Sequence, residues 1–190
     1  MRLLSCTLGA FLSALVLVGN VGAQVFTPTF TSPRLLNEVG VTVSDGPGNL
    51  TFEGIWRGGP LGLRLGFVDG RGGLISVGGE LRSPVQITGA PMGLAFTAAA
   101  QGLLGDENAV GAHAGLSAGY TFTGNGLAIT PYLHPRIGLV NNLGEGDELE
   151  LQLLADLGTD VEFWNNILVR VGVKLDDVGS SWGIGLGWRR

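Results

Sequence analysis

The strictest pattern in this chain is an alternation of apolar and polar residues with a period of two. The segment 167–175 reads ILVRVGVKL, in which Arg170, Gly172 and Lys174 separate apolar residues. Side chains of a β-strand point alternately to its two faces, so this pattern predicts a strand with one apolar and one charged face. The apolar face packs either in a protein core or against a membrane, and a single strand does not distinguish between these two possibilities.

Segments with the same period recur between turn-forming sequences, and no helical period persists after residue 23. Regularly spaced strands without helices indicate an antiparallel all-β protein, a sandwich or a barrel. The strands after residue 92 reach the ~9–11 residues of a transmembrane strand, which favours the wall of an up-and-down membrane barrel. We expect ten strands, or eight if the segments before residue 60 are not wall. They are predicted at residues 34–44, 49–57, 60–68, 74–82, 92–104, 110–123, 127–140, 147–163, 167–175 and 181–188.

The pairing of the last strands indicates which face is which. We expect residue 163 opposite residue 167, which places Asp160 opposite Arg170. Asp156 then faces Lys174, and opposite charges directly across a strand pair are favourable. The next hairpin is expected to place residue 175 opposite residue 182, with glycines facing the basic side chains. Because so many charges are costly in a dry core, we predict that the apolar face is outside and the polar face lines a lumen.

The predicted lumen and its rims contain three sets of residues. The lumen charge network is expected to comprise Arg64, Arg136, Glu150, Asp156, Asp160, Glu162, Arg170 and Lys174. Further polar lumen residues are His113, Tyr132 and His134. Aromatic residues near strand ends are typical of the interfacial belt of a membrane barrel. The expected belt comprises Trp56, Tyr120, Phe122, Phe163, Trp164, Trp182 and Trp188.

Two prolines lie within the predicted strand 127–140. Pro131 and Pro135 have no N–H group to donate to a neighbouring strand, and proline in a sheet usually marks an edge or a bulge. We therefore expect a bulge or kink at these positions, or a strand that is assigned wrongly.

The first 23 residues have the layout of a secretory signal peptide. A basic start at Arg2 is followed by a short apolar run and by small residues that end at Ala23. We expect cleavage there, which leaves residues 24–190 as one barrel domain without cysteine, because Cys6 is the only cysteine of the chain. Without Arg2 the chain has 10 basic and 16 acidic residues and a net charge of −6, which argues against nucleic acid as a partner. We expect no cofactor and no metal.

The chain resembles the small bacterial outer-membrane β-barrel proteins. The signal peptide, the alternating strands and the final segment SSWGIGLGWRR, with apolar residues from Trp182 to Trp188, carry the resemblance. Arg189 and Arg190 extend beyond the aromatic residue at which that family usually ends. The resemblance implies location in the outer membrane, contact with its lipid bilayer, and recognition of the C-terminal strand by the barrel insertion machinery.

Three functions are compatible with this reading. A charge-paired, filled lumen favours a structural or anchoring protein, or one that contacts an unidentified surface partner through its outer loops. A narrow passive channel for small solutes is the alternative if the glycine-lined side of the lumen leaves a water path. A secreted soluble barrel that binds an apolar ligand is the second alternative, and its two faces would be inverted.

The sequence offers little for catalysis. Barrel lipid A deacylases use a His-x-Ser pair, whereas Ser117 follows His113 by four residues, about 13 Å along a strand. Barrel proteases place paired acids and a histidine at the outer rim, which Asp176, Asp177 and His113 imitate only loosely. We therefore predict that the chain is not an enzyme, with a barrel hydrolase as the residual alternative.

Overall fold

A computed structural model describes residues 25–45, 50–69, 73–86, 92–105, 108–143, 149–164, 166–176 and 179–190. The predicted signal peptide, residues 1–23, lies outside these ranges, as do parts of the predicted outer loops. Within them, no helix is long and apolar enough to cross a membrane.

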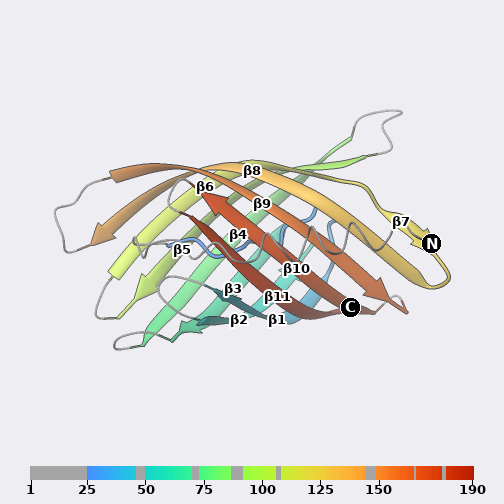
Figure 1. Ribbon diagram of the computed structural model, residues 1–190, viewed down its shortest axis with the longest axis horizontal. Coiled ribbons are helices and arrows are strands. Elements are labelled where there is room, and N and C mark those ends of the chain that lie inside the picture. Colours follow the sequence, from blue (N-terminus) through green and yellow to red (C-terminus); the bar gives the residue numbers. More distant parts are fainter. Residues whose placement is uncertain are drawn as a thin grey trace.

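The described chain forms a closed antiparallel barrel (Figure 1). Neighbouring strands pair in chain order from β1 to β6, β6 pairs with β8, and β11 returns to pair with β1. The short β7 pairs with the start of β8 in the same register as β6, so eleven strands form a ten-stranded wall. The prediction of an up-and-down barrel with ten strands is therefore confirmed. The strands are β1 (Glu38–Asp45), β2 (Leu50–Gly58), β3 (Leu61–Val68), β4 (Leu74–Val85), β5 (Gly93–Leu104), β6 (Asn108–Gly119), β7 (Phe122–Gly124), β8 (Leu127–Leu143), β9 (Leu149–Phe163), β10 (Ile167–Asp176) and β11 (Ser180–Arg189).

The apolar side chains point outward and the polar ones inward. Leu65 on β3 is 64% exposed, whereas its neighbour Arg64 is only 7% exposed. The same alternation holds on β9, where Leu153 is 65% exposed and Asp156 is buried. A wall covered with exposed leucine, valine and aromatic side chains suits lipid rather than water. The alternative of a soluble barrel with an apolar interior is therefore wrong, and the fold is of the outer-membrane type.

The predicted strand registers are confirmed in one hairpin and wrong by two residues in the next. Residue 163 lies opposite residue 167, and Asp160 lies opposite Arg170. In the last hairpin, Trp182 lies opposite Val173 rather than opposite residue 175. The connection is tighter than expected, because the N–H of Gly179 donates to the Asp176 carboxylate at 2.7 Å. A shift of two residues leaves every side chain on its predicted face.

The two prolines of β8 interrupt its pairing without shifting the register. Pro131 lies opposite the break between β6 and β7, and Pro135 lies where the β6–β8 ladder lacks two pairs. The register is the same on both sides of each gap, so the expected bulge is absent from this described strand. The strand assignment is correct, because each proline only removes a donor on the side of β6 and β7.

The first wall strand begins later than predicted. We expected a strand over residues 34–44, but β1 spans Glu38–Asp45. Residues 25–36 lie inside the barrel instead and are buried or half-buried. We call residues 25–36 the plug.

The outward face yields a prediction about stability in lipid. Leu65→Arg places a charge in the lipid-facing part of β3, and we expect it to lower the free energy of unfolding by about 2–4 kcal/mol. Urea unfolding of protein refolded into phospholipid vesicles measures this. Leu149→Arg is the matched control, because both leucines are 64% exposed but Leu149 begins β9. We expect a cost of about 0–1 kcal/mol there; equal costs at both positions would contradict the membrane assignment.

Candidate functional site: a charged lumen filled by the N-terminal plug

The plug crosses the barrel from the end that holds the C-terminus to the end that holds the predicted outer loops. Its contacts follow β9 in order: Arg34 contacts Glu162, Ser32 contacts Asp160, and Thr29 contacts Asp156. At the far end, Val25 and Phe26 are buried in a small apolar cluster. That cluster also contains Val68, Leu103, Ala109, Val140 and Leu154, which come from strand ends.

Wall side chains bind the plug backbone at consecutive residues. Each carbonyl oxygen from residue 26 to residue 31 accepts a hydrogen bond from a wall side chain at 2.7–3.4 Å. In the order of the plug residues, these donors are Lys174, Arg136, Arg64, Arg57, Arg57 again and Ser117. Buried carbonyl groups must find donors, so this arrangement satisfies a segment that has no strand partner and whose backbone turns at Phe30, where φ is 51°.

The plug hydroxyl groups bind the acidic side chains of the wall. Thr29 donates to Asp156 at 2.5 Å, and Ser32 donates to Asp160 at 2.8 Å. Thr27 and Thr31 each donate at 3.3 Å, to Glu53 and Glu80 respectively. Bonds to a charged acceptor are stronger than those between neutral groups. The wall therefore recognises the plug side chains as well as its backbone.

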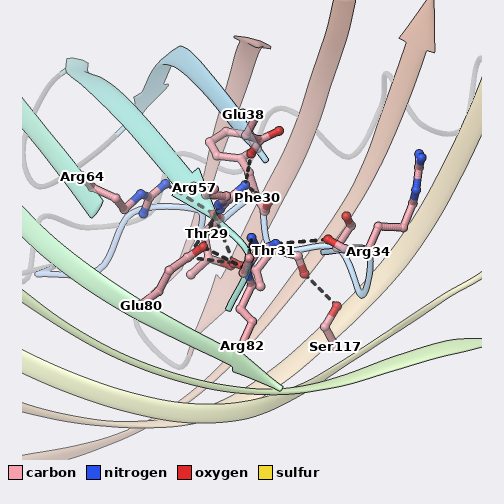
Figure 2. A network of polar contacts seen from close by, with 12 residues as sticks. Thr29, Phe30, Thr31, Arg34, Glu38, Arg57, Arg64, Glu80, Arg82 and Ser117 are labelled. Atoms are coloured by element: carbon pink, nitrogen blue, oxygen red, sulfur yellow. Dashed lines mark hydrogen bonds and ion pairs between the residues drawn. The ribbon is translucent and has the colours of Figure 1, made fainter. Parts of the chain in front are cut away.

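Arg57 connects the plug with the ion pairs of the wall (Figure 2). Its guanidinium donates to the carboxylates of Glu38 at 2.9 Å and Glu80 at 2.6 Å. The same group donates to the carbonyl oxygens of Thr29 and Phe30, both at 3.0 Å. Arg57 is 1% exposed, so this charge depends entirely on protein partners.

The ion pairs continue beyond Arg57 on both sides. Arg170 donates two hydrogen bonds to Glu38, each at 2.7 Å, and one to Asp160 at 3.1 Å. Glu80 also lies 3.4 Å from Arg82. Among the described residues, six acidic and six basic residues are buried as whole residues, and the side chain of Asp176, which pairs with Lys174, is buried as well. The residues buried as a whole are Glu38, Glu53, Glu80, Asp156, Asp160 and Glu162 with Arg57, Arg64, Arg82, Arg136, Arg170 and Lys174.

The structure differs from the predicted charge network at two points. Glu150 is exposed near the beginning of β9 and lies outside the buried set. Lys174 lies opposite Asp156 in the register, but its ammonium pairs with Asp176 at 2.7 Å. Asp156 is occupied by other donors, since it binds Arg136 at 2.9 Å and Thr29. The other predicted members are buried side chains of the lumen: Arg64, Arg136, Asp156, Asp160, Glu162, Arg170 and Lys174.

The two histidines and Tyr132 also lie inside the barrel. His134 is fully buried; its Nε2 lies 2.7 Å from the Thr97 hydroxyl and its Nδ1 lies 3.0 Å from the Thr29 hydroxyl. The Asp156 carboxylate lies 3.3 Å from the same Nδ1. This hydroxyl–imidazole–carboxylate order resembles a hydrolase triad, but the plug covers it. His113 contacts the ring of Phe26 edge-on at 5.2 Å between centroids.

No metal site is evident in the described part of the chain, where no three His, Cys, Asp or Glu side chains are grouped to hold an ion.

Six of the seven predicted belt aromatics lie at the barrel end that holds the C-terminus. Tyr120 contacts Phe122 and Phe163 contacts Trp164, with centroids 4.6 and 6.0 Å apart. Trp182 lies near the start of β11, at the opposite end, and is half-buried. The members at the first end are Trp56, Tyr120, Phe122, Phe163, Trp164 and Trp188.

Glycines of the wall make room for the plug rings. A Cβ atom on Gly111 or Gly138 would lie 2.7 Å from the Phe26 ring, and one on Gly183 would lie 2.6 Å from the Phe30 ring. We expected the glycines of β11 to make room for basic side chains. At Gly185 the close neighbour of a Cβ atom would be the methyl group of Thr42, at 2.9 Å, whereas Arg170 would lie at an ordinary contact distance of 3.5 Å. Gly183 accommodates an aromatic ring of the plug, so neither glycine is needed to make room for a basic side chain.

The base of the plug is tied to the C-terminus of the chain. Glu162 binds Arg34 at 2.8 Å and also pairs with Arg189. The backbone N–H of Arg190 donates to the carbonyl oxygen of Asn37 at 2.9 Å. The two arginines that extend past the last aromatic residue therefore anchor the position where the plug joins the wall.

Neither the plug nor the centre of the ion network was expected from the sequence. Glu53, Arg57, Glu80 and Arg82 alternate with outward apolar residues, so the period-two pattern could have identified them. Nothing comparable marks the plug, whose sequence VFTPTFTSPRLL repeats threonine at every second position from 27 to 31 but does not alternate apolar with polar residues. Its two prolines argue against a strand but do not indicate where the segment lies.

Comparisons with known proteins add little beyond the fold. No family model matches the chain, and no curated protein matches it. Among solved structures, the chain is similar to the crystal structure of the outer membrane enzyme PagL, with a TM-score of 0.39 and 15% sequence identity. The match covers 80% of this chain and 97% of that one. We expected from the sequence that the chain is not an enzyme; the solved structure that it resembles is described as an enzyme, so that expectation is withdrawn.

The central arginine yields a prediction about stability. Arg57→Ala removes a buried guanidinium that is shared by Glu38, Glu80 and two plug carbonyl groups. Glu38 keeps Arg170 and Glu80 keeps Thr31, but the carbonyl oxygen of Phe30 loses its donor and the buried acids lose a countercharge. We expect the free energy of unfolding to fall by about 3–5 kcal/mol, measured by urea titration in vesicles. Arg190→Ala is the matched control, because its side chain is exposed, and we expect a change within about 0.5 kcal/mol. A small effect at Arg57 would mean that the network adds little to stability.

Proposed function

We propose that the protein is a closed outer-membrane barrel with a structural or anchoring role, which contacts surface partners through its outer loops. One observation carries this proposal: the plug spans the lumen, and wall side chains bind its backbone carbonyl groups from Phe26 to Thr31. An eight-stranded barrel is filled by its own side chains, and ten strands leave only a little more room. Twelve plug residues in that room disfavour a passive channel.

We propose location in the outer membrane on the same argument about surfaces. The outward leucines and the aromatic residues at the strand ends support contact with a lipid bilayer. We also propose that the insertion machinery recognises the C-terminal strand β11, whose outward residues end with Trp188. The signal peptide would direct the chain to export and would be removed after Ala23.

Fractionation tests the proposed location. We expect the expressed protein in the outer-membrane fraction, with faster gel migration when unheated than when boiled, because closed barrels resist dodecyl sulfate. N-terminal sequencing of this material is expected to begin at Gln24. Recovery from the soluble exported fraction without a mobility shift would contradict the proposal.

Planar-bilayer recording tests whether the barrel is closed. We expect no steady single-channel steps from the intact protein, because the plug and the paired charges fill the lumen. A variant that lacks residues 25–35 is expected to show steps, and its heat-dependent gel mobility provides the control for folding. Steady steps from the intact protein would favour the passive channel instead.

A further inference from the structure

The plug is held in the barrel as a bound peptide is held, rather than as a strand of the wall. The barrel closes through the pairing of β1 with β11, so its ladder is complete without the plug. In the described part of the chain, the polar contacts of residues 25–36 with the wall all involve a wall side chain. Every wall strand thus keeps its backbone partners whether or not the plug is present.

The wall recognises two features of the plug. Its donors bind consecutive carbonyl groups, which any extended peptide presents. Its acids bind hydroxyl groups at residues 27, 29 and 31, which recur at every second position, and at residue 32. The first feature selects a largely extended backbone that turns at Phe30, where φ is 51°. The second selects threonine or serine at fixed positions.

Two sockets fix the position of the plug along the barrel. The ring of Phe26 lies against Gly111 and Gly138, and the ring of Phe30 lies against Gly172 and Gly183. Arg136 also lies 5.6 Å from the centroid of the Phe26 ring, within the range of a cation–π contact. A peptide displaced by one residue would put its rings and hydroxyl groups against the wrong partners.

We propose that the lumen is a peptide-binding site for extended segments of the pattern Phe-Thr-x-Thr-Phe-Thr-Ser, and that the plug is its exchangeable ligand. This inference rests on the proposed closed barrel and adds that the closure is reversible. The ligand class is an extended peptide with hydroxyl side chains at alternate positions and aromatic residues four apart. The occupant in this structure is residues 25–36 of the chain itself.

Covalent attachment hides this exchange in the intact chain. A tethered segment binds with an effective concentration near the millimolar range, so a free peptide competes poorly with it. Cutting the tether after folding removes this competition, whereas the uncut chain requires millimolar peptide. Residues 34 and 35 are half-buried at the base of the plug, whereas residues 25–33 are buried, so a sequence inserted after Leu35 lies outside the most buried part of the plug.

The test uses the full chain with a protease recognition sequence inserted between Leu35 and Leu36. After refolding in detergent and cleavage, we expect the fragment to remain bound through gel filtration. A fluorescent peptide QVFTPTFTSPRL is then expected to replace it, and mass spectrometry follows the released fragment. The matched control peptide carries valine in place of Thr27, Thr29 and Thr31, and we expect it to bind at least tenfold more weakly.

Two outcomes overturn the inference. If the fragment never exchanges while the cut barrel keeps its heat-dependent gel mobility, the plug is a permanent part of the core. If the valine peptide binds as well as the native one, the acidic side chains do not select hydroxyl groups. Neither result depends on a conductance measurement. Steady channels in the intact protein would refute the proposed closed barrel. A closed barrel whose plug does not exchange would refute only the peptide-binding inference.

A second measurement covers the case in which the insertion prevents folding. In the uncut full chain, Ser32→Cys with Cys6→Ser places one thiol at a position that is 1% exposed. Millimolar native peptide is expected to accelerate its reaction with a thiol reagent at least threefold, because displacement of the plug exposes it. The valine peptide is expected to leave the rate unchanged. An equal rate with and without the native peptide would contradict exchange.

Discussion

The arrangement of the side chains inside this barrel depends on the free-energy cost of burying charge. Closing ten strands around a lumen removes the inward side chains from water, and an unpaired buried charge is among the most destabilising features a protein can contain. The wall meets this constraint with a run of alternating ion pairs from Asp160 through Arg170, Glu38 and Arg57 to Glu80. Arginine suits this role because its planar guanidinium donates to two acids at once and never loses its charge.

The plug supplies partners for the hydrogen-bond donors and acceptors that the ion pairs of the wall leave unused. Arg57 has more donors than its two carboxylates use, and the remaining ones bind plug carbonyl groups. The acids likewise have acceptor capacity that threonine and serine hydroxyl groups occupy, as at Asp156. The wall and the plug are therefore complementary, and removal of either would leave polar groups without partners. This complementarity supports both the closed barrel and its reading as a peptide site.

The geometry of the buried Thr97–His134–Asp156 arrangement depends on the same packing of the plug against the wall. His134 is held between a wall hydroxyl and a plug hydroxyl, so its position depends on whether the plug is bound. Displacement of the plug would uncover an imidazole next to a carboxylate inside the lumen. Occupancy of the lumen thus determines which polar groups meet solvent, and the proposed peptide exchange would change the chemistry of the interior along with its permeability.

The sequence determined the wall, and the tertiary structure decided what fills it. Alternation with a period of two predicted the strands, their faces and the pairing of Asp160 with Arg170, because side-chain direction in a strand is a local property. The partner of Lys174 and the register of the last hairpin depended on competing contacts and on a tight turn. The place of the plug could not be read locally, because its partners lie on seven wall strands that only the closed barrel brings around it.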